Sequence, residues 1–316
     1  MKDIQIGEHR VPPGSKLAVV QELTLAGHRF EIPLFLINGA LEGPTLVVTA
    51  GVHGAEYASV EAALRTGRSL ASEGLRGRAI VAPVVNMPAF RARSIYVSPL
   101  DGKNLNRLFP GKPDGTVSEQ LAHWLFQNLI RQADYYLDLH GGDLIEALVP
   151  FSLYDRSDDQ ALEQKSAELA HTFGIEYVLR DGTPGSAYSS ASQAGIPSMI
   201  AEAGGQGLWP LGEVVLLANG VNRVMRHLGM LPGPTPEPVP TRVLTESDWL
   251  RSDHTGFYYP QVDVGQFVVQ GQELGVVTDF QGRVLQDARA PRDGRVLFIV
   301  SSLAMNKGDP LVAVGA

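Results

Sequence analysis

The chain has 316 residues, of which 44% are hydrophobic and 19% are charged, and its 26 basic and 34 acidic residues give a net charge of −8. This composition predicts one large globular domain with a smaller one, and the charge argues against nucleic acid or an anionic membrane as a partner. The absence of cysteine excludes disulfides and thiolate metal ligands and is typical of a cytoplasmic protein. We find neither a signal-peptide core nor an apolar run of about 18 residues that could cross a membrane.

The first third of the chain contains apolar runs that predict strands. Residues 17–24 and 28–37 are expected to pair as a hairpin at one edge of a sheet. The run at residues 45–51 predicts a buried strand that ends at a glycine, and residues 78–86 predict another buried strand. Between these two, the apolar spacing over residues 57–73 is typical of a helix.

Strands and helices alternate in the middle of the chain, after a polar stretch over residues 87–116. A polar loop of this length inside a compact domain is usually functional. Helices are predicted over residues 118–132, 158–173, 187–194 and 211–228, and strands over residues 135–140, 147–154, 175–180 and 198–202. The alternation predicts an α/β fold with a mostly parallel sheet.

The last quarter of the chain differs in composition from the rest. Residues 231–240 are rich in proline and predict a stiff linker. Residues 241–316 are short β-type runs broken by glycines, which predict a small all-β barrel or sandwich. We therefore expect an α/β domain over residues 1–230, a linker, and a small C-terminal β domain.

Three predicted strands end in side chains that can bind a metal or move a proton. His53 and Glu56 follow the first buried strand, His140 ends a second strand, and Glu202 ends a third. In an open α/β sheet, ligands bind in the crevice beyond the carboxyl ends of the strands. We therefore expect these four side chains to lie close together, with His140 as the natural third ligand beside His53 and Glu56.

Two imidazoles and one carboxylate form a ligand set that catalytic zinc sites use, with a fourth position open for water. The same ligands also suit Mn²⁺, Co²⁺ or Ni²⁺, so the residues leave the ion open. Asp138 lies two residues before His140 and faces the same side of its strand, where it could hydrogen-bond the imidazole or simply close the strand end. Glu202 could take a proton from water and pass it to a leaving nitrogen.

The polar stretch contains arginines and amides that suit an anionic substrate. Asn104, Asn106 and Arg107 lie within four residues, and a guanidinium beside an amide can bind a carboxylate through two hydrogen bonds. The alternative for Arg107 is a structural ion pair. A second arginine near the metal could stabilise the oxyanion of a tetrahedral intermediate.

Four motifs in this order resemble the succinylglutamate desuccinylase/aspartoacylase family, which consists of zinc hydrolases related to the carboxypeptidase A type. The motifs are Gly-Val-His53-Gly-Ala-Glu56, Asn104-Leu-Asn106-Arg107, Asp138-Leu-His140-Gly-Gly and Ala-Glu202-Ala-Gly-Gly. The resemblance covers roughly residues 40–230, and the C-terminal β segment resembles an extra domain of bacterial deacylases in the family. It implies that His53, Glu56 and His140 bind one zinc ion, that Asn106 and Arg107 hold the substrate carboxylate, and that Glu202 is the general base.

One position departs from the family pattern. Family members usually carry an arginine directly before the position of Tyr96, and this chain has Ile95 there. Arg93 lies two residues earlier, which in an extended segment keeps the same side. We therefore expect Arg93 to take over the oxyanion role.

Together these features predict a zinc-dependent amidohydrolase that removes the acyl group from a small anionic N-acyl amino acid or a related amine. Two alternatives stay open. One is a zinc carboxypeptidase that acts on short peptides, and the other is a non-catalytic zinc-binding module. A homodimer or a tetramer is expected only because such assemblies are common.

Overall fold

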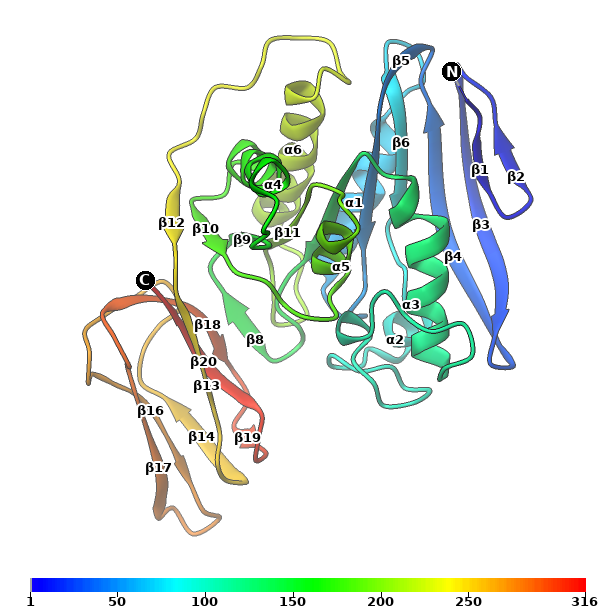
Figure 1. Cartoon of the computed structure of the whole chain (residues 1–316). Coiled ribbons are helices and arrows are strands. Elements are labelled where there is room, and N and C mark those ends of the chain that lie inside the picture. Colours follow the sequence, from blue (N-terminus) through cyan, green and yellow to red (C-terminus); the bar gives the residue numbers. More distant parts are fainter. Residues whose placement is uncertain (1) are drawn as a thin grey trace.

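A nine-stranded mixed sheet forms the centre of the molecule, in a computed structural model that describes residues 2–316 (Figure 1). Its strands in spatial order are β12 (Arg242–Leu244), β10 (Tyr177–Arg180), β9 (Phe151–Tyr154), β11 (Ser198–Glu202), β7 (Tyr135–His140), β5 (Leu41–Ala50), β6 (Arg76–Ala82), β4 (His28–Asn38) and β3 (Ser15–Leu25). Five neighbouring pairs are parallel and three are antiparallel. The prediction of an α/β fold with a mostly parallel sheet is confirmed.

Helices cover both faces of the sheet, because its central strands are apolar on both sides. The helices are α1 (Tyr57–Ser69), α2 (Met87–Ala92), α3 (Val117–Asn128), α4 (Gln160–Phe173), α5 (Ala187–Gln193) and α6 (Leu211–His227), with short 3-10 turns η1 (Leu105–Arg107) and η2 (Ile130–Gln132). Leu46 and Val48 of β5 pack into the core under α1, α4 and α6. Val47, between them, packs into the opposite core with α3 and α5. The alternation along one strand thus joins the two layers of helices to the sheet.

The C-terminal β unit, residues 247–315, consists of two antiparallel sheets that pack around a core of their own. One sheet contains β13 (Ser247–Arg251), β20 (Pro310–Gly315), β18 (Gly294–Val300) and β15 (Phe267–Val268). The other contains β17 (Val284–Arg289), β16 (Glu273–Thr278), β14 (Gly256–Pro260) and β19 (Ala304–Met305). The prediction of a small all-β part at the C-terminal end is confirmed.

The run at residues 147–154 was expected to be one strand, and the structure corrects this. It divides into β8 (Glu146–Leu148), which pairs with β18 of the C-terminal β unit, and β9, which stays in the large sheet. Pro150 lies between them and has no backbone N–H to donate to a ladder. The preceding residue, Val149, donates its N–H to the carbonyl of Leu297 at 3.0 Å. This segment therefore joins the two parts of the molecule.

The structure contains several elements that were not predicted from the sequence. The polar stretch contains the short helix α2 and the turn η1, and a small hairpin of β1 (Ile4–Ile6) and β2 (His9–Val11) precedes the first predicted strand. The expected edge hairpin is present as β3 and β4, which pair along their full length. The proposed division of the chain at residues 231–240 stays a prediction, since β12 follows that segment and still pairs with β10. Within residues 2–316, none of the helices has the length and apolar character needed to span a bilayer.

Two glycines of α6 provide a test of how tightly the helix packs. A methyl group at Gly220 would lie 2.1 Å from the buried ring of Phe173, whereas one at Gly212 would meet no atom within 4 Å. We expect Gly220→Ala to lower the free energy of unfolding by about 1–3 kcal/mol through overpacking. Gly212→Ala should leave it unchanged or raise it slightly, because alanine favours the helix. Thermal denaturation at constant metal loading measures both, and equal stability of the two variants would contradict the packing argument.

Candidate active site

Three strands of the large sheet end side by side, and this edge contains the candidate site. Ala50 of β5 pairs with Leu139 of β7, and His140 of β7 pairs with Glu202 of β11. The chain leaves β5 through Gly51, whose φ of +66° is in the left-handed region that glycine adopts readily. The side chain of Asn86 fixes the following turn, because its Nδ2 donates to the carbonyl of Val52 at 3.0 Å. His53 is thereby presented at the edge of the sheet.

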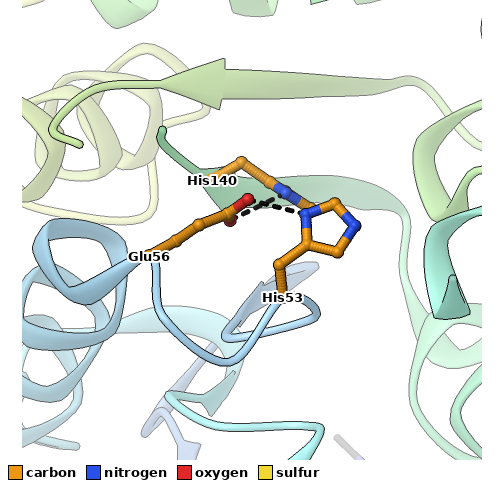
Figure 2. A group of neighbouring side chains, drawn as sticks. All are labelled: His53, Glu56 and His140. Carbon is orange, nitrogen blue, oxygen red and sulfur yellow. Dashed lines mark hydrogen bonds and ion pairs between the residues drawn. The ribbon is translucent and has the colours of Figure 1, made fainter. Parts of the chain in front are cut away.

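His53, Glu56 and His140 converge from two directions (Figure 2). Glu56 is the N-cap residue of α1, His53 lies in the loop before it, and His140 ends β7. Nδ1 of His53 is 2.6 Å from Oε1 of Glu56, and Nδ1 of His140 is 3.0 Å from Oε2. One ligand atom from each residue lies within 4.8 Å of the others. The three residues therefore form a metal-binding triad.

The electrostatics of the triad fit a cation. Burial raises the pKa of Glu56, but the positive charges of His140 and His53 outweigh this effect and hold it at about 2. Burial lowers the pKa of His140, and the carboxylates of Glu56 and Asp138 outweigh it and raise the pKa well above its ordinary value. Without a proton or an ion between them, these groups could not be buried together. The donor set of two imidazoles and one carboxylate is one that zinc accepts.

Asp138 lies directly behind His140. Its side chain is completely buried, and its Oδ1 accepts a hydrogen bond of 2.7 Å from the hydroxyl of Thr49. Its Oδ2 is 3.2 Å from Nε2 of His140, the ring nitrogen that faces away from Glu56. This is the position from which a carboxylate can orient a metal-ligating imidazole. The role of Asp138 in metal binding stays a prediction.

A cavity of about 560 Å³ opens in front of the triad and contains most of the other predicted residues. Its wall includes Glu202, Asn106 and Arg107. Burial raises the pKa of Glu202 well above its ordinary value, against the opposing charge of His140. Burial lowers the pKa of Arg107, whose Nη1 donates to the carbonyl of Asn106 at 2.7 Å. The catalytic and binding roles of these three residues stay predictions.

Arg93 does not line the cavity of the triad. It is exposed at the end of α2 with a φ of +53°, so the chain is not extended there and the argument that every second residue faces the same side does not apply. Arg93 instead lines a separate cavity of about 610 Å³ with Tyr57, Phe90 and Trp209. Its predicted oxyanion role receives no support from this position.

Asn104 was named from the sequence as part of a motif, but it was given no role of its own. Its Oδ1 is 3.1 Å from Nε2 of His53 and also accepts the backbone N–H of Asn106 at 2.8 Å. Asn104 thus holds the ring of His53 by contact with the nitrogen that faces away from Glu56. Its place in the Asn-Leu-Asn-Arg motif, two residues before Asn106, was the available signal.

Other residues that sequence reasoning missed come from distant segments. Tyr96, Glu146 and Asp181 line the cavity, as do several residues of the C-terminal β unit, namely Trp249, Arg251, Phe298 and Pro310. Burial raises the pKa of Glu146 to about 7, and Tyr96 forms a hydrogen bond with this carboxyl group. No periodicity or motif marks these residues in the sequence.

Comparisons with known proteins agree with this site. Residues 42–228, more than half of the chain, match the family described as succinylglutamate desuccinylase/aspartoacylase catalytic domain. The chain is 31% identical over 292 residues to N-alpha-acetyl-L-2,4-diaminobutyric acid deacetylase of Halomonas elongata. This alignment covers 90% of this chain and 85% of that protein. It is 32% identical over 190 residues to succinylglutamate desuccinylase of Pseudomonas paraeruginosa, covering 54% of each chain.

The solved structures point the same way. The product-bound structure of the ectoine utilization protein EutE (DoeB) from Ruegeria pomeroyi superposes with a TM-score of 0.88 at 28% sequence identity and covers 97% of each chain. The fold and the triad therefore define a metal-dependent deacylase, an enzyme that hydrolyses linear amide C–N bonds. The chain belongs to the succinylglutamate desuccinylase/aspartoacylase family.

Asn104 provides a test of how the ring of His53 is held. We expect Asn104→Ala to weaken metal binding by about 10- to 100-fold, the usual effect of removing a residue that orients a metal ligand. Asn104→Asp keeps an oxygen for both hydrogen bonds and should restore most of the affinity. Competition with a fluorescent chelator measures the metal affinity, and Asn128→Ala on α3 is the control. Equal affinities of wild type and Asn104→Ala would show that Asn104 only supports the loop.

Proposed function

We propose that the protein is a zinc-dependent deacylase whose substrate is a small N-acyl amino acid, with N-acetylated diamino acids as the first candidates. The observation that carries the proposal is the metal triad, which shares one cavity with Glu202 and Arg107. The Halomonas elongata relative supports the choice of an N-acetyl diamino acid. A cavity of about 560 Å³ lies within the ordinary size range for sites that bind small molecules.

The charges that line the cavity support a diamino acid over a substrate such as succinylglutamate. Glu146, Asp181 and Glu202 contribute carboxyl groups beyond the triad, and Arg107 and Arg251 contribute two guanidinium groups. Succinylglutamate carries three carboxylates, which is more than the two guanidinium groups of this cavity can pair. An N-acetylated diamino acid has one carboxylate for the arginines and one free ammonium group for an acidic residue.

Zinc held by His53, Glu56 and His140 would supply a Lewis acid and lower the pKa of a bound water toward about 7. Glu202 faces the same cavity and, in its ionised form, takes a proton from the attacking water. The carboxyl group then returns this proton to the amide nitrogen as the C–N bond breaks, which gives a carboxylic acid and a free amine. Burial suits Glu202 to accept the proton, because a carboxylate whose pKa is raised is a stronger base than an exposed glutamate.

Arg107 and Asn106 would bind the carboxylate of the substrate. The oxygen of Asn106 already accepts the backbone N–H of Ala187 at 3.0 Å, at the start of α5. Its amide group is therefore fixed, and the NH₂ end stays available for a ligand. Arg107 has no carboxylate oxygen within 4 Å among residues 2–316, so the structural ion pair considered from the sequence is absent from the described part of the chain.

A substrate panel tests the proposal. Primary amine release would be measured from N-acetyl, N-succinyl and N-formyl amino acids, including Nα-acetyl-2,4-diaminobutyrate, and from dipeptides, each with and without a chelator. We expect chelator-sensitive release that added zinc restores, fastest from an N-acetyl diamino acid. Release from dipeptides alone would favour the carboxypeptidase alternative. Silence across the panel with zinc bound would overturn the proposal and favour the non-catalytic alternative.

The role of Glu202 can be tested separately. Glu202→Gln should lower kcat by at least about 100-fold and leave the zinc content unchanged, because the amide cannot accept the proton. Since the wild-type carboxyl group must be ionised and its pKa is raised, activity should fall with decreasing pH at values above the ordinary glutamate pKa of about 4.3. Glu213→Gln is a matched control, because burial also raises the pKa of Glu213, which does not line the cavity. A Glu202→Gln variant with full activity would exclude the assigned role.

A further inference from the structure

The C-terminal β unit forms one side of the cavity in front of the triad. β8 pairs with β18, with Leu148 opposite Phe298, and both residues line the cavity. In the same sheet, Arg251 at the end of β13 pairs with Pro310 of β20, and these two residues also line it. Strand pairing therefore holds the end of β13 over the cavity.

The side chain of Arg251 is held by a backbone carbonyl. Its Nη1 donates to the oxygen of Gly308 at 2.9 Å, in the turn before β20. That turn is tied back to the chain after β13, since Gly308 donates its N–H to the carbonyl of Ser252 at 2.7 Å. The guanidinium group thus has a defined position at the rim, although the residue as a whole is exposed.

Arg251 and Arg107 line the same cavity, and within residues 2–316 neither forms an ion pair. Among residues 2–316, no carboxylate oxygen lies within 4 Å of either guanidinium group, and each forms a hydrogen bond only with a backbone carbonyl. Burial lowers the pKa of Arg107 and the charge of Arg251 lowers it further, while the charge of Glu202 acts in the opposite direction, so the two guanidinium groups interact across the cavity. Two guanidinium groups that repel each other across a cavity form a site for an anion.

We propose that Arg251 is a substrate-binding residue that, together with Arg107, binds the free carboxylate of the substrate from the side opposite the metal triad. A carboxylate has two oxygens, so each arginine can bind one of them, or one arginine can bind both. This inference rests on the proposed deacylase function. It assigns a specificity role to the C-terminal β unit, because a substrate without a free carboxylate would leave two like charges unbalanced.

The test compares a substrate with and without its carboxylate. Wild type, Arg251→Met and Arg251→Lys would be assayed with Nα-acetyl-2,4-diaminobutyrate and with its carboxamide. We expect Arg251→Met to raise KM for the acid by about 10-fold or more, the usual effect of losing a hydrogen bond between charged groups, and to change kcat much less. KM for the carboxamide should not change. Arg251→Lys keeps the charge without the planar fork and should fall between wild type and Arg251→Met.

Arg295→Met is the matched control. Arg295 also belongs to the C-terminal β unit, and its Nη1 also donates to a glycine carbonyl, that of Gly265 at 2.7 Å, but it does not line the cavity. Its removal should leave both KM values unchanged. Because Arg251 lies at an exposed rim, the KM of wild type for the acid should also rise with ionic strength, and that of Arg251→Met should rise less.

The outcomes separate this inference from the proposed function. If wild type hydrolyses the acid and Arg251→Met has the same KM, or if KM rises equally for acid and carboxamide, the inference is wrong and the deacylase function stands. If wild type is inactive on the whole panel, the proposed function fails. In that case, the affinity of zinc-loaded wild type and Arg251→Met for free 2,4-diaminobutyrate, measured by calorimetry, tests the inference. Binding weakened about 10-fold in Arg251→Met supports it, and equal binding or none to wild type overturns it.

Discussion

The structure depends on one buried carboxylate held between two imidazoles. Glu56 is only 3% exposed and His140 only 1%, so their charges must be balanced within the protein or by an ion. For the charges of Glu56 and the two histidines to balance one another, the loop after β5 must lie next to the end of β7. These two strands are parallel neighbours in register at this edge of the sheet. The parallel pairing of β5 and β7 therefore brings together the groups whose charges must balance.

The surroundings hold the two imidazoles by different means. His140 belongs to a strand, and the carboxylate behind it, Asp138, is itself fixed by Thr49 of the neighbouring strand. His53 lies in a loop, and its ring is oriented by Asn104 from a turn more than 50 residues away. The loop is also packed closely: a methyl group at Gly54 would lie 2.1 Å from the backbone carbon of Ala89 in α2. The long polar stretch of the sequence thus serves to support the metal ligands.

The triad could be predicted from the sequence because its geometry is local to strand ends. His53, Glu56, His140 and Glu202 follow apolar runs, and parallel strands bring their carboxyl ends to one edge. Arg93 could not be placed, because its left-handed backbone conformation leaves no trace in the pattern of apolar residues. The division of residues 147–154 between two sheets was equally hidden, since both halves read as one β run. It depends on β18, which lies about 150 residues further along the chain.

The part of the cavity wall that contains Arg251 also could not be predicted from the sequence, because it depends on contacts between distant segments. The α/β part contributes the metal ligands, Glu202 and the first arginine, all of which lie within one continuous stretch of the chain. Another part of the wall comes from β13, β18 and β20, and the pairing of β8 with β18 joins their sheet to the rest of the chain beside the cavity. If Arg251 binds the substrate carboxylate as proposed, a substitution in β13 changes one of the two charges that meet the substrate and leaves the triad untouched. A neutral residue at the end of β13 would then weaken the preference for a carboxylate, because Arg107 alone would remain, and the metal site would not change.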